Sequence, residues 1–142
     1  MILHGADIVT WVHQRMPDNL GFDNPVGLAL ITDNKLMGGV VFDNYRPETR
    51  NISISIAIDD KKCLTRQNIL NIGNYVFNQI GAKRVNATIL KSNIPSQVLT
   101  RRLGFMQEGT LRQASLNDED LLIFGLLRHE FESKWLKSSR HT

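Results

Sequence analysis

The stretch that most constrains this chain is an alternating strand followed by a basic loop and a helix, over residues 52–81. Isoleucines alternate with serine or alanine through residues 52–58, which is the two-residue period of a pleated strand. Apolar residues then recur at helical spacing and predict a helix from Thr65. Thr65 suits its N-cap, and Gly81 suits a left-handed residue at its end.

The junction between this strand and this helix, residues 59–64, is polar and basic. The first N–H groups of a helix have no partners inside it, and the helix dipole favours negative charge there. The junction therefore predicts an anion site, with Lys62 and Arg66 as its cationic side chains. The alternative is that both are solvated cations at a helix start.

Charge is spread unevenly along the chain. Residues 61–112 carry nine Lys or Arg and one acidic residue, Glu108, for a net charge of +8, whereas residues 1–60 carry −4 and residues 113–142 carry −1. The overall charge of +3 therefore conceals a strongly basic middle. This pattern favours a small polyanion as partner, and leaves nucleic acid as a less favoured one.

Length and composition predict one cytoplasmic domain spanning residues 1–142. No apolar run approaches the ~20 residues that cross a bilayer, so no membrane partner is expected. The first seven residues lack the basic and apolar regions of a signal peptide. The single cysteine, Cys63, fits a reducing compartment. Its neighbouring lysines could lower its pKa, but a lone cysteine is more often inert. No histidine has metal-ligand spacing, so no metal is expected.

The order of predicted elements indicates an α/β (α+β) fold with a mixed, mostly antiparallel central sheet and helices on both faces. Asp33-Asn34 reads as a hairpin turn, and Gly38-Gly39 as a bulge or a close approach. The unit from residue 52 to residue 90 would form a parallel strand pair through a right-handed crossover. Helices are predicted at residues 8–16, 65–81, 92–104 and 128–137, and strands at 26–32, 35–45, 52–58, 84–90, 107–113 and 121–127.

Four segments of the second half carry a family resemblance: Tyr75–Val85, Asn93–Ser96, Arg102–Phe105 and Glu108–Arg112. Together they resemble the GNAT superfamily of acetyl-CoA-dependent N-acetyltransferases, closest to the branch that includes ribosomal-protein N-terminal acetyltransferases. The chain is also similar to small GNAT proteins carried by phages and prophages. The resemblance covers about residues 52–136 well. The first third of the chain matches the family only in the order of its strands. It implies the GNAT acyl-CoA N-acyltransferase fold.

The resemblance implies direct transfer of an acetyl group from acetyl-CoA to a primary amine, either a protein or peptide N-terminus or a small-molecule amine. Ser96 would be the catalytic residue, as the proton donor to the departing thiolate. The other implied residues would bind the cofactor through its pantetheine arm or its phosphates: Ile56, Ala57, Ile58, Lys62, Leu64, Thr65, Arg66, Asn93 and Arg102.

The chain departs from the family pattern in two places. The glycine-rich pyrophosphate loop is replaced by residues 60–66, where Lys62 and Arg66 would partly substitute for it. The tyrosine that many members use as general acid is absent, with Thr100 at about its position, and no general base is identifiable. These departures keep a second hypothesis open: a catalytically degenerate GNAT-fold protein that binds nucleic acid or acts as a regulatory module.

Simpler structural roles exist for three of the site residues. Asn93 and Ser96 could be a helix cap and a first-turn polar residue, and Arg102 could complement the helix dipole. A homodimer is left open. Acidic residues in the loop after residue 16 and in the last hairpin favour a cationic amine or a basic N-terminal peptide as acceptor: Asp18, Asp23, Asp118, Glu119 and Asp120.

Overall fold

A computed structural model describes residues 2–4, 6–16 and 21–136. It forms two compact units, residues 1–82 and residues 83–142, and each is considered by itself. No helix among the described residues is both long and apolar enough to cross a membrane.

The first unit contains four strands in the order β1-β2-β3-β4, each antiparallel to its neighbour. The predicted hairpin turn is confirmed, because Asp33 and Asn34 have φ values of 54° and 60°, the left-handed conformation of a tight two-residue turn. The strand β1 was not predicted, since three residues are too few to display a period. The bounds are β1 Ile2–His4, β2 Val26–Thr32, β3 Lys35–Arg46 and β4 Asn51–Ile58.

The helical segments of this unit are α1 (Ala6–His13), the single turn η1 (Lys61–Cys63), α2 (Arg66–Asn74) and its continuation η2 (Tyr75–Ile80). Both predicted helix caps are confirmed. The Thr65 hydroxyl accepts the Asn68 N–H at 3.0 Å, and Gly81 has φ +86°. Helix α1 ends three residues before the predicted limit at residue 16.

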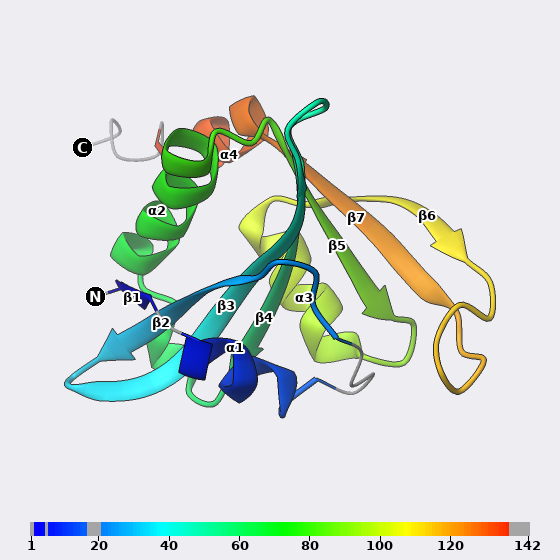
Figure 1. The fold of residues 1–142 in the computed structure, drawn as a ribbon, viewed down its shortest axis with the longest axis horizontal. Helices are drawn as coiled ribbons and strands as arrows, with labels where there is room; N and C mark the ends of the chain where they lie inside the picture. Colours follow the sequence, from blue (N-terminus) through cyan, green and yellow to red (C-terminus); the bar gives the residue numbers. More distant parts are fainter. Residues whose placement is uncertain (1, 5, 17–20, 137–142) are drawn as a thin grey trace. The chain divides into compact units, whose positions relative to one another are not determined.

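The Gly38-Gly39 pair lets the chain pack closely on both faces of β3. A Cβ at Gly38 would lie 2.9 Å from the Cys63 sulfur of η1, and one at Gly39 would lie 2.7 Å from the side chain of Val12 on α1. Real Cβ atoms do not approach so closely, so the predicted close approach is confirmed. The blue helix α1 and the segment from η1 to α2 therefore lie on opposite faces (Figure 1).

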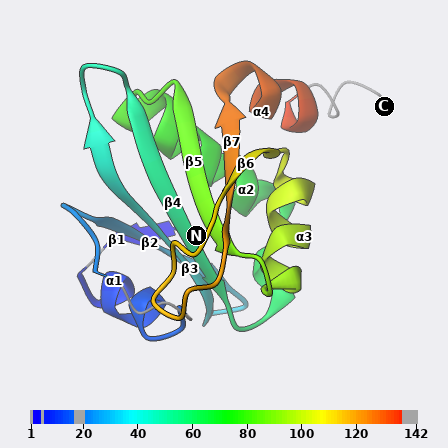
Figure 2. The same ribbon diagram turned by 90° about the vertical axis from the view of Figure 1, so that its right-hand side faces the viewer.

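The second unit is a three-stranded antiparallel sheet in the order β5-β7-β6. Strand β5 is Arg84–Leu90, β6 is Met106–Leu111 and β7 is Leu121–Leu127. Helices α3 (Ile94–Leu103) and α4 (Arg128–Trp135) lie on one side of β5 and β7 (Figure 2). The predicted buried face of β5 is confirmed by its three inward residues, Val85, Ala87 and Ile89.

Helix α3 ends at Gly104, whose φ is +112°, and Phe105 is buried directly after it, as predicted. The indole Nε1 of Trp135 donates to the Leu103 carbonyl at 2.9 Å and so ties α4 to this end of α3. Strand β6 ends two residues before the predicted limit at residue 113, and α4 ends at residue 135. The predicted frayed tail at residues 138–142 lies outside the described residues.

Candidate functional site

The end of β4 lies between two packed layers. Ala57 is buried with Val12 and Val41, under α1. Ile56 and Ile58 are half-buried on the opposite face, where Ile58 pairs with Gly38. The end of the strand therefore has one buried side chain and two half-buried ones.

The loop after β4 makes a tight turn without glycine. The Asp60 carboxylate accepts the Lys62 N–H at 2.9 Å, and the Lys61 carbonyl accepts the Leu64 N–H at 3.0 Å. Leu64 is half-buried, whereas Lys62 is exposed. A carboxylate thus occupies an amide that a glycine-rich loop would offer to phosphate, and the exposed cations remain on the outer side of the turn.

The start of α2 is locked by a residue that the sequence analysis did not select. Asn68 is 3% exposed, and its Nδ2 donates to the Cys63 carbonyl at 2.9 Å. Thr65 and Arg66 are exposed beside it. The structure therefore brings together the predicted loop residues Lys62, Leu64, Thr65 and Arg66. Asn68 could have been selected from the sequence, because it lies three positions after the cap residue Thr65 and directly before the apolar Ile69.

The predicted residues Asn93 and Ser96 share the first turn of α3. The Asn93 side chain accepts the Ser96 N–H at 3.3 Å, so Asn93 is the N-cap. Buried Gln97 donates to the carbonyls of Leu90 and Lys91, at 3.2 and 2.8 Å, and fixes the turn between β5 and α3. The capping role of Asn93 is thereby confirmed, and contact of either residue with a cofactor stays a prediction.

Arg102 lies toward the other end of α3. Six residues separate it from Ser96, which corresponds to roughly 9 Å along a helix axis. It is exposed, whereas Thr100 is 7% exposed inside the unit. The structure thus does not bring Arg102 to the first turn of α3, and Thr100, at about the position of the missing tyrosine, is buried.

The structure supports the inert reading of Cys63 and not a lowered pKa. Cys63 is fully buried, and this burial raises the pKa of its thiol, with the nearby Asp60 and Asp59 carboxylates acting in the same direction. Only the thiolate is an effective nucleophile. Cys63 is therefore a core residue that packs against Gly38.

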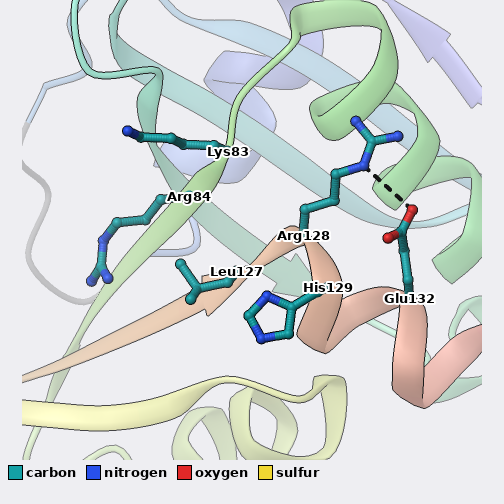
Figure 3. Close-up of a pocket in the computed structure, with 6 residues that line it drawn as sticks. All are labelled: Lys83, Arg84, Leu127, Arg128, His129 and Glu132. Carbon is teal, nitrogen blue, oxygen red and sulfur yellow. Dashed lines mark hydrogen bonds and ion pairs between the residues drawn. The ribbon is translucent and has the colours of Figure 1, made fainter.

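A hollow of about 400 Å³ lies at the start of β5 and of α4 (Figure 3). Its cationic groups do not converge: Lys83 and Arg84 point to one side, and Arg128 points to the other, toward Glu132. Arg84 is also paired with Glu108. The hollow contains none of the predicted site residues, and its lining is Lys83, Arg84, Leu127, Arg128, His129 and Glu132.

Comparison with known proteins adds independent information. No protein-family model matches the chain. The chain is 27% identical over 129 residues to the SPbeta prophage-derived N-acetyltransferase YokL of Bacillus subtilis, covering 86% of this chain and 70% of that protein. The predicted similarity to a prophage-borne acetyltransferase is confirmed.

Solved structures share its fold. The spermidine/spermine N-acetyltransferase SpeG of Vibrio cholerae superposes with a TM-score of 0.74 at 14% identity, covering 94% of this chain and 99% of that one. The chain therefore has the GNAT acyl-CoA N-acyltransferase fold, and its sequence is similar to that of a prophage-derived N-acetyltransferase. A probable acetyltransferase (TM-score 0.65, 24% identity) covers 75% of this chain, which spans 64% of that structure's length.

A third GNAT neighbour is RimJ of Mycobacterium smegmatis, solved with CoA-disulfide. It has a TM-score of 0.63 at 16% identity, covering 78% of this chain and 60% of that one. The predicted α/β class, a mixed sheet with helices, is confirmed by these matches. The described residues of the chain contain no group of three or more His, Cys, Asp or Glu that could hold a metal ion.

Proposed function

We propose that this GNAT chain transfers the acetyl group of acetyl-CoA directly to a primary amine. The observation that carries the proposal is the junction of β4, η1 and α2. There the exposed Lys62 and Arg66 stand at the capped start of a helix, a few residues after the end of β4. This is an arrangement suited to a strand-bound pantetheine arm that ends in a diphosphate.

In this proposal, backbone groups of Ile56, Ala57 and Ile58 hold the pantetheine arm. The segment Lys62–Arg66 holds the diphosphate, with side-chain charge compensating for the amide that Asp60 occupies. Asn93 and Ser96 act from the first turn of α3, and Arg102 provides a further cation. The supporting observations are the exposure of Lys62 and Arg66 and the shared turn of Asn93 and Ser96.

The reaction needs few protein groups, because a thioester is already activated. The amine nitrogen forms a bond to the acetyl carbon, and strand amides stabilise the resulting oxyanion. The carbon–sulfur bond then breaks, and the departing sulfur takes the hydroxyl proton of Ser96, which water replaces at the same time. Asp59 is paired with Arg15, and Asp60 caps η1. The amine proton therefore passes to solvent through water.

Calorimetric titration with acetyl-CoA and CoA tests cofactor binding directly. We expect the unsubstituted protein to bind both in the micromolar range. Arg66→Ala should raise the KM for acetyl-CoA and change kcat less, because the contact of Arg66 with phosphate is the same before and during the reaction. Arg128→Ala, which removes another exposed arginine, is the control. The absence of heat at high micromolar cofactor would reject the proposal.

A DNA-binding assay on the same purified protein distinguishes the transferase from the second hypothesis, a catalytically degenerate nucleic-acid-binding module. Salt-dependent retention on single-stranded or duplex DNA that CoA competes poorly would favour a nucleic-acid-binding module. Retention that CoA abolishes would favour the transferase, because both ligands would then use one basic surface.

We propose a cationic amine or a basic N-terminal peptide as the acceptor. The connection between β6 and β7 presents Asp118, Glu119 and Asp120. Two of these carboxylates are held in place, Glu119 by the Ser92 N–H at 2.5 Å and Asp120 by the Gln113 N–H at 2.9 Å. SpeG, which shares the fold, is named for polyamine substrates.

An acceptor screen tests this assignment. We expect polyamines or peptides with basic N-terminal residues to be acetylated faster than neutral amines of the same size. Asp118→Asn, at an exposed residue of the connection, should reduce this preference, because it removes one charge. A screen in which neutral or anionic amines alone react would contradict the assignment.

A further inference from the structure

Arg15, which follows α1, makes four contacts that fix its guanidinium. Its Nε and Nη2 donate to the two carboxylate oxygens of Asp59 at 2.9 and 3.0 Å, and its Nη1 donates to the Trp11 carbonyl at 3.0 Å. The guanidinium also lies 3.5 Å from the centroid of the Trp11 ring. A bidentate pair stacked on an aromatic ring holds one defined geometry, unlike a typical surface pair.

Asp59 is the residue at which β4 leaves the sheet. Its N–H and that of Asp60 both donate to the Met37 carbonyl, at 2.8 and 3.1 Å. Asp60 then caps η1 through the Lys62 N–H. The position of the loop that carries Lys62 thus depends on the Asp59-Asp60 junction, to which Arg15 is clamped.

The charge of this junction is unfavourable for a phosphate site without Arg15. Residues 59–66 carry three cationic and two acidic side chains, so the net charge of this segment is only +1. Arg15 neutralises Asp59 and restores a second positive charge. Exposed ion pairs contribute little to folding stability, and the side chains of Arg15 and Asp59 are 33% and 48% exposed.

We propose that Arg15 supports the cofactor site through its charge: it neutralises Asp59, which stands where the phosphate-binding loop starts. This inference rests on the proposed function. It makes the affinity for CoA depend on a residue outside the loop, at the end of α1.

A double-mutant cycle on CoA binding tests the inference, with Arg15→Met, Asp59→Asn and the double variant. Methionine keeps an apolar stem on Trp11 while removing the charge. We expect Arg15→Met to weaken CoA binding about 5-fold at low salt, because it exposes a diphosphate to one more negative charge. Asp59→Asn should bind at least as tightly as the unsubstituted protein, and the double variant should match Asp59→Asn.

Two further readouts separate this role from a structural one. Arg15→Lys keeps the charge and should retain affinity within about 2-fold, and the defect of Arg15→Met should shrink in high salt. Arg128→Met, which breaks the exposed pair with Glu132, is the matched control and should bind CoA normally. Melting temperatures of all variants should change by only a few degrees, about what an exposed pair contributes.

The outcomes are distinct. Failure of the unsubstituted protein to bind CoA would overturn the proposed function and this inference with it. Normal binding by Arg15→Met would overturn the inference alone, as would a double variant as weak as Arg15→Met. Equal defects at low and high salt would also overturn it.

Discussion

Replacing Ser96 by alanine is expected to lower kcat by about 10–100-fold while leaving acetyl-CoA affinity nearly unchanged. In the proposed mechanism, the Ser96 hydroxyl acts only when the carbon–sulfur bond breaks. Its removal should therefore slow the reaction without weakening the binding of acetyl-CoA. The fold should tolerate the change, because Asn93 bonds the backbone N–H of Ser96, which alanine keeps. Steady-state kinetics with calorimetric titration of CoA measures both quantities.

Ser92 offers a matched control for Ser96. It lies four residues earlier and is exposed, and its backbone N–H is what the Glu119 carboxylate accepts. Ser92→Ala should therefore turn over like the unsubstituted enzyme. If Ser96→Ala also keeps full activity, the thiolate takes its proton from water and Ser96 is a first-turn helix residue without a catalytic role.

Phe124→Ala is expected to lower the free energy of unfolding by a large amount. Phe124 is fully buried in β7, the middle strand of its unit, and Arg101 of α3 lies 5.2 Å from the ring centroid. Truncation of a buried phenylalanine removes transfer free energy and leaves a cavity, at a cost of about 3–5 kcal/mol. That is a large part of the ~5–15 kcal/mol that holds a domain folded.

Urea unfolding at constant protein concentration measures this loss. Met106→Ala on the neighbouring strand β6 is the control, because Met106 is 59% exposed, and it should change the unfolding free energy by less than about 0.5 kcal/mol. A loss below about 1 kcal/mol for Phe124→Ala would show that the sheet relaxes around the missing ring.

Local signals in the sequence determined most elements and their ends. The alternating isoleucines identified β4, and Thr65, Gly81, Asn93 and Gly104 identified the ends of two helices. These predictions succeeded because a cap or a left-handed residue acts within a few bonds of its own position.

Tertiary contacts decided the rest. The sequence could not reveal β1, because three residues acquire strand geometry through pairing with β2. It suggested that lysines lower the pKa of Cys63, whereas burial against Gly38 raises it.

The residues around the candidate site divide in the same way. The exposed cations Lys62 and Arg66 could be selected from sequence, because charge segregation is visible there. Asn68, Gln97 and Arg15 could not, since each acts through a hydrogen-bond partner that only the folded chain provides: the Cys63 carbonyl, the Leu90 and Lys91 carbonyls, and the Asp59 carboxylate. Composition and period determine which segments form. Which polar side chains become fixed depends on the three-dimensional position of their partners.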